Sequence, residues 1–216
     1  MAITELIFPN VIPTKGVLDE IEQNWPIISK SLIEPNPGLI SAFRGWVLSE
    51  DGKDVRDQHR EIIIFEWTEE AAFHAFVASA QFASFANSIR HLVSGPPKLQ
   101  LYETNISPKE SSIAPVVEIF RLGVNGPEAI QAAQEIWEDL SQTLSRSGRL
   151  APVTLGKSLN LEGDVVVGIL GWASTEAHEE GAQDVAFVEA LASLRLLGEL
   201  SQIIVDVAPM EGLSAL

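Results

Sequence analysis

The sequence predicts an α+β fold made of two tandem copies of one unit. Three observations predict it. The chain resembles itself over most of its length, each copy reads strand, helix, strand, strand, helix, strand, and the strands are apolar on both faces.

The duplication is visible in two segments, "EWTEEAAFHAFVASAQF" at 66–82 and "GWASTEAHEEGAQDVAF" at 171–187. The spacing that separates Trp67 from Trp172 also separates Phe82 from Phe187. A slightly larger spacing relates Trp25 to Trp137, which indicates loops of different length in the two copies.

The first copy contains six predicted elements. Residues 4–8 form a strand, and residues 17–33 repeat apolar side chains at helical spacing, with Pro26 inside the repeat. Residues 39–48 and 61–67 are rich in β-branched and aromatic residues and flank a polar loop, which is typical of a hairpin. A helical region over 69–93 and a strand over 98–104 complete the copy.

The second copy repeats this order. Strands are predicted at 114–122, 151–160, 164–172 and 202–208, and helical regions at 127–144 and 175–200, with Pro127 at a helix start. We therefore expect a first repeat over 1–106, a linker over 107–114 and a second repeat over 115–216.

The strands indicate how the two copies meet. An antiparallel sheet with one face in water alternates apolar and polar residues. "EIIIFEW" and "DVVVGILGW" are instead almost continuously apolar, so helices should cover one face of each sheet and the other sheet should cover the second face.

Composition limits the function. A formal net charge of −16 and a pI near 4.5 disfavour nucleic acids and anionic membrane surfaces as partners. The absence of cysteine excludes disulfides and thiolate chemistry. We expect a cytoplasmic protein, because no signal peptide or membrane-spanning segment is apparent.

The second copy carries the pattern W-x-S-x-E-A-H followed by a phenylalanine. With the order of elements, this pattern resembles the dimeric α+β barrel superfamily, in particular its antibiotic-biosynthesis monooxygenase type. The resemblance implies tandem ferredoxin-like repeats, two four-stranded antiparallel sheets each backed by helices, which form an intramolecular α+β barrel. The residues that carry it are Trp172, Ser174, Glu176, Ala177, His178 and Phe187, and the first copy keeps Trp67 and Phe82 but has Phe73 in place of the histidine.

Members of this superfamily oxygenate aromatic polyketides without a cofactor, degrade haem, or catalyse decarboxylation, cyclisation and isomerisation, so the fold leaves the reaction open. Haem-degrading members carry an asparagine, a tryptophan and a helical histidine. Asn10 and Trp67 fit this pattern, but residues 83–86, after Phe82, contain no histidine, which disfavours haem degradation.

The candidate catalytic residues each have a structural alternative. Arg44, next to Gly45, either holds a substrate carboxylate or enolate, or pairs with Glu66 or Glu5. Tyr102 either donates to a substrate carbonyl or is an edge residue in water. The histidine candidates are His74, His91 and His178, which act as acid–base groups only if they face the cavity and are otherwise core or surface residues, whereas His59 is expected to be solvated.

Aromatic residues are the candidate substrate contacts. Trp46 has no aromatic counterpart in the second copy, where Lys157 takes its place, so it is a better candidate for lining a pocket than the paired tryptophans. The predicted site lies in the first copy, between sheet and helices, and its substrate-binding residues are Trp46, Trp67, Phe65 and Phe82.

We therefore predict an enzyme of secondary metabolism that acts on a hydrophobic aromatic or polyketide-like small molecule with neither cofactor nor metal, and that is monooxygenase-like by resemblance. The alternatives are a decarboxylase, cyclase or isomerase of the same superfamily, or a non-catalytic small-molecule-binding barrel. We expect the protein to be either a monomer, in which the two fused copies form a pseudo-dimer, or a homodimer.

Overall fold

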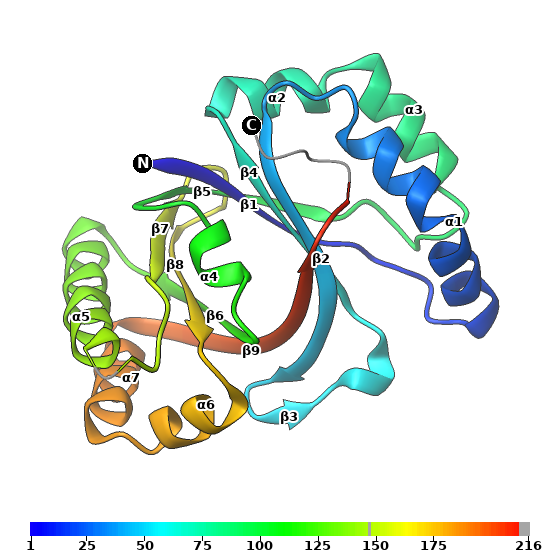
Figure 1. Cartoon of the computed structure of the whole chain (residues 1–216). Coiled ribbons are helices and arrows are strands. Elements are labelled where there is room, and N and C mark those ends of the chain that lie inside the picture. Colours follow the sequence, from blue (N-terminus) through cyan, green and yellow to red (C-terminus); the bar gives the residue numbers. More distant parts are fainter. Residues whose placement is uncertain (147, 212–216) are drawn as a thin grey trace.

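The computed structural model describes residues 1–146 and 148–211, and both repeats contain the expected elements (Figure 1). In the first repeat, the strands are β1 (Ala2–Phe8), β2 (Leu39–Glu50), β4 (Glu61–Trp67) and β5 (Lys98–Thr104), with a short β3 (Lys53–Asp54) in the hairpin loop. The helices are α1 (Lys15–Ile33), α2 (Glu70–Val77) and α3 (Ala80–Ser88).

The second repeat has the same order of elements. Its strands are β6 (Val116–Val124), β7 (Thr154–Ser158), β8 (Asp164–Trp172) and β9 (Gly198–Pro209), and its helices are α5 (Pro127–Ser145), α6 (Thr175–Ala182) and α7 (Val185–Leu197). A short helix, α4 (Lys109–Ser112), lies in the segment expected to be a linker. Each predicted second helical region is two helices, and α3 ends at Ser88, before the predicted limit of 93.

The strands close into one antiparallel barrel. The order is β2-β4-β1-β5 in the first repeat and β7-β8-β6-β9 in the second, and the two halves join through β5–β7 and β2–β9. Matching glycines lie at these junctions. A Cβ on Gly45 would lie 1.7 Å from the carbonyl oxygen of Asp206, and one on Gly156 would lie 2.6 Å from that of Glu103, so only glycine permits this strand spacing.

The apolar residues form three clusters. One fills the barrel and draws on both repeats, including Leu6, Phe43, Ile64, Val117 and Ile169. The other two lie between the outer face of each half-sheet and its own helices, on opposite sides of the barrel in Figure 1. This arrangement explains why the strands are apolar on both faces.

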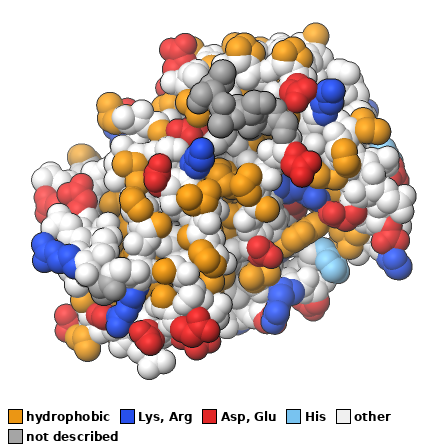
Figure 2. All heavy atoms as spheres, in the orientation of Figure 1, with side chains coloured by type: hydrophobic (Ala, Val, Ile, Leu, Met, Phe, Trp, Pro, Cys, Tyr) orange, Lys and Arg blue, Asp and Glu red, His pale blue; other side chains and the backbone are white. Residues whose placement is uncertain are grey.

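Acidic side chains are spread over the face of the molecule shown in Figure 2, and Lys and Arg do not gather into a patch there. Within the described residues, no helix combines the length and apolar character needed to cross a membrane.

Candidate active site

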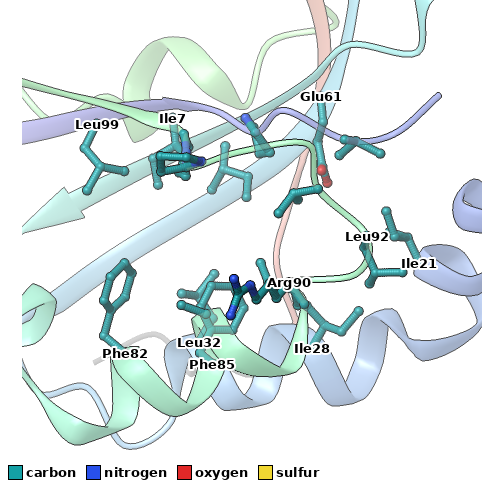
Figure 3. Close-up of a pocket in the computed structure, with 18 of the residues that line it drawn as sticks. Ile7, Ile21, Ile28, Leu32, Glu61, Phe82, Phe85, Arg90, Leu92 and Leu99 are labelled. Carbon is teal, nitrogen blue, oxygen red and sulfur yellow. The ribbon is translucent and has the colours of Figure 1, made fainter.

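A cavity of about 520 Å³ lies in the first repeat, between the outer face of its half-sheet and helices α1 and α3. In Figure 3, Ile28, Leu32, Phe82 and Phe85 of the helices face Ile7 and Leu99 of the strands across this space. Almost all lining side chains are apolar, and the charged exceptions are Glu5, Glu61 and Arg90. A largely apolar cavity with a few polar groups is the usual form of a small-molecule site.

Glu5 is the central polar group of this cavity. It lies in the middle of β1, is 2% exposed, and accepts a hydrogen bond of 2.8 Å from the indole Nε1 of Trp67. Burial raises the pKa of Glu5 from 4.5 to about 7, and the Trp67 hydrogen bond opposes this rise only in part. Glu5 can therefore both accept and release a proton near neutral pH.

Glu61 lies at one end of the cavity and has a cationic partner. Arg44 donates from Nε to Glu61 and from Nη2 to Glu22 at 2.9 Å, and its guanidinium carbon lies 3.7 Å from the ring centroid of Trp25. Burial raises the pKa of Glu61, and Arg44 opposes that rise. Glu61 and Arg44 thus form an ion pair within the protein, whereas Glu5 has no cationic partner among the residues that the structure describes.

Arg90 is the one cation among the described residues that line the cavity. It lies just after α3 and, in Figure 3, between the helices and the sheet. Its side chain is exposed and makes no hydrogen bond or ion pair with any described residue. The guanidinium is therefore free to contact an anionic group of a bound molecule.

The matching layer of the second repeat is packed instead. Trp137 is 1% exposed and its ring lies 5.1 Å from that of Phe120 and against Gly168, where a Cβ would come within 3.3 Å of the indole. Strand register places Ile63 where the second repeat has Gly168. Trp25, the counterpart of Trp137, does not pack in the equivalent way but lies half-buried over Arg44 and lines the cavity.

The counterpart of Glu5 is Glu118, which accepts a hydrogen bond of 2.9 Å from Trp172 Nε1. Glu118 has two further polar partners, because Gln202 Nε2 donates to it and His178 Nε2 lies 3.5 Å from its carboxylate. The hydrogen bond with Glu118 raises the pKa of His178, against the opposing effect of burial. In the first repeat, Leu99 and Phe73 occupy the positions of Gln202 and His178.

The cavity lies in the layer where the sequence predicts the site, but it includes only part of the predicted set. Phe65 and Phe82 line it, and Trp67 is buried behind Glu5. Arg44 is paired with Glu61 and Glu22 rather than with Glu66 or Glu5, and Trp46, whose ring centroid lies 5.4 Å from the Arg44 guanidinium carbon, is not a lining residue.

The remaining candidates lie elsewhere. His74 and His91 are exposed and contact Glu70 and Glu20, and neither lines the cavity. Tyr102 is neither an edge residue in water nor part of this site, because its side chain is fully buried in the barrel, on the other face of the sheet. His178 faces Glu118 in the packed second repeat.

Glu5 was not among the predicted catalytic residues, although the sequence contains a signal for it. A carboxylate in the middle of an apolar strand, repeated at Glu118 in the second copy, must be buried with a partner or with a shifted pKa. Among residues 1–146 and 148–211, no group of three or more His, Cys, Asp or Glu side chains is placed to hold a metal ion.

Solved structures of similar fold cover almost the whole chain. An anthrone oxidase-like protein superimposes with a TM-score of 0.66 at 15% identity, covering 99% of this chain and 95% of that one. A candidate monooxygenase from Fusobacterium nucleatum gives 0.62 at 10% identity, covering 95% and 92%, and one from Lactobacillus acidophilus gives 0.58 at 10% identity, covering 96% of each chain.

These similarities confirm the fold inferred from the sequence, an α+β barrel formed by tandem copies in one chain. No protein-family model and no curated protein matches the sequence.

Proposed function

We propose that the chain is an oxygenase that takes a hydrophobic aromatic molecule into the cavity of the first repeat and uses Glu5 as general base. The observation that carries the proposal is a carboxyl group with a pKa of about 7 and no cationic partner among the described residues, in a largely apolar cavity. A general base works best when its pKa lies near the working pH, and a perturbed carboxyl in a cleft marks a functional site.

The shape and lining of the cavity favour the substrate class. Its walls are aliphatic and aromatic, and the Arg90 guanidinium lies where it can stabilise an oxygen that becomes negative as the substrate loses a proton. The proposed substrate is thus a polycyclic aromatic ketone or phenol whose C–H bond is acidic. The anthrone named in the description of one similar structure belongs to this class.

The reaction balances with dioxygen as the only co-reactant. Glu5 takes a proton from the ring methylene, and the resulting carbanion, whose charge is spread into the ketone oxygen, transfers its electrons to dioxygen as a C–O bond forms. Glu5 returns the proton to the peroxide, which loses water to leave a new carbonyl. One dioxygen is consumed and one water released, and because the substrate supplies the electrons, the proposal requires no cofactor.

Anthrone and an oxygen electrode test this proposal. We expect anthrone to be converted to anthraquinone with one dioxygen consumed per molecule, and Glu5→Gln to lower kcat by about 100-fold. Glu118→Gln is the matched control, since it makes the same change at the equivalent position of the packed repeat, and it should retain the kcat of the folded protein.

The alternatives give different results. Anthrone could instead exchange its methylene proton with D₂O in a Glu5-dependent way while no oxygen is consumed. That result would support Glu5 as the general base and would favour an isomerase or decarboxylase over an oxygenase. Saturable binding of anthrone with neither exchange nor oxygen uptake would contradict an enzyme and favour a binding protein. Equal activity of Glu5→Gln and the wild type would remove Glu5 from the mechanism.

A further inference from the structure

A second pocket, of about 300 Å³, lies at the end of the barrel. Its residues come from both repeats, with Phe8, Lys98 and Gln100 from the first and Ile119, Arg121 and Ser201 from the second. It differs from the active-site cavity in position, because Ile119 and Ile203, which line it, belong to the cluster inside the barrel. Of the described residues, only Pro96 lines both pockets.

The charge of this pocket is opposite to that of the chain. Three cationic side chains line it, Arg60, Lys98 and Arg121, against a single carboxylate, Glu50. Glu50 is already paired with Arg60, through contacts of 2.6 and 3.2 Å. Lys98 and Arg121 make no ion pair with any described residue, in a chain whose net charge is −16.

Arg121 is held in position by the interior of the barrel. Its Nε donates a hydrogen bond of 3.3 Å to the hydroxyl of Tyr102, which is fully buried and itself donates to Gln100 Oε1 at 2.9 Å. The guanidinium is thus half-buried, contacts a phenol and makes no ion pair with any described carboxylate. A cation removed from water without a counter-ion is costly, and an anionic ligand would offset that cost.

The fold does not impose these charges. Strand register makes Phe8 the counterpart of Arg121, Ser201 that of Lys98, and Ile203 that of Gln100. All six residues line the same pocket, and each repeat contributes one of the two unpaired cations, Lys98 beside Phe8 and Arg121 beside Ser201. Neither cation is repeated at the matching position of the other copy, so these charges are not a consequence of the duplicated unit.

We propose that the end of the barrel is a binding site for a small oxyanion, a phosphate or a carboxylate, contacted by Arg121 and Lys98. Arg121 presents a planar set of donors that suits either group, and Lys98 adds a mobile charge at the rim. Nothing in this proposal depends on Glu5 or on the reaction in the other cavity.

Tyr102 gives a direct test, because it is the only tyrosine of the chain and its hydroxyl contacts Arg121. Protein labelled with ¹³C at the tyrosine Cζ would be titrated with inorganic phosphate and, separately, with succinate, at constant ionic strength set with sodium chloride. We expect a saturable shift of the single signal with at least one oxyanion, and the anion that gives it identifies the ligand as phosphate or carboxylate.

Substitutions connect the shift to the proposed contacts. Arg121→Gln should weaken binding at least tenfold. Lys98→Gln, which removes an exposed charge and leaves the barrel intact, should weaken it about fivefold even if Arg121→Gln fails to fold. Lys109→Gln, the same change at an exposed lysine remote from the pocket, and Glu5→Gln should bind as the wild type does. No saturable shift with either oxyanion, or equal binding by the wild type and Lys98→Gln, would overturn the proposal.

Discussion

Glu5 and Glu118 hold matching positions on the first strands of the two repeats, and each accepts a hydrogen bond from a matching tryptophan. Their surroundings differ. Glu118 also contacts Gln202 and His178 and lies under a packed layer, whereas Glu5 faces a cavity and has Leu99 and Phe73 at the positions of those two polar partners.

The two repeats share one part of the site and differ in another. The Trp–Glu pair occurs in both repeats and therefore belongs to the unit that was duplicated. Burial raises the pKa of Glu5, and apart from Trp67 no hydrogen-bond donor or cation among the described residues opposes that rise. In this pair of repeats, a few apolar substitutions separate a structural carboxylate from a reactive one.

The largest expected contrast concerns the paired tryptophans. Trp137→Ala should cost about 4 kcal/mol of unfolding free energy, because it empties a fully packed position. Trp25→Ala should cost about 1 kcal/mol, since that ring is half-buried beside an existing cavity. Urea unfolding of both variants measures the contrast, and equal costs would show that the two layers are packed alike.

The next contrast is the dependence of stability on pH. Because the pKa of Glu5 is raised in the folded state, the folded protein binds the proton more tightly, and the free energy of unfolding falls as pH rises from 4.5 through 7. The fall attributable to Glu5 is about 3 kcal/mol. We expect Glu5→Gln to lack it, so that the variant is the more stable protein at pH 8, as urea unfolding at pH 5 and pH 8 can measure.

A more specific change would transfer the polar partners to the first repeat. Phe73→His with Leu99→Gln should lower the pKa of Glu5 toward its ordinary range and reduce kcat at pH 7 about tenfold, because a weaker base removes the substrate proton less readily. The control is Phe73→Leu with Leu99→Met, which alters the packing without adding a donor. A pH–rate profile that does not move would contradict this explanation of the raised pKa.

The smallest contrast is the reverse exchange, His178→Phe. The raised pKa of His178 means that its ion pair with Glu118 stabilises the fold fully below pH 6.5 and is lost as pH rises through the folded-state value. The variant should therefore lose about 1 kcal/mol at pH 5.5 and less at pH 9. A loss independent of pH would indicate that His178 acts by packing alone.

The duplication and the order of elements were predictable because they rest on local patterns, such as the spacing of Trp67 and Trp172 and the apolar strands. The composition of the site was not, because it depends on which face of a strand a side chain occupies. Tyr102 and Glu103 are neighbours in β5, yet Tyr102 points into the barrel, and a one-residue difference in register would have exchanged them.

The partners of Arg44 depend on the same geometry. Glu61 lies on the adjacent strand, two residues from Ile63, the register partner of Arg44. Glu22 reaches Arg44 from α1, a contact that no spacing within the sequence specifies. Glu5 itself was visible as a carboxylate in an apolar strand. The sequence did not show that Glu5 lacks the polar partners of Glu118, because this depends on the three-dimensional positions of Leu99 and Phe73.

The proposed base, Glu5, should ionise near neutral pH, and a titration of its carboxyl group measures this. The side-chain Cδ signals of ¹³C-labelled glutamate can be followed from pH 3 to 9, with the Glu5 signal assigned by its loss in Glu5→Gln. We expect a midpoint of about 7 for this signal. A midpoint near the ordinary value of 4.5 would show that the carboxyl is solvated or paired, and would contradict its role as the base of this site.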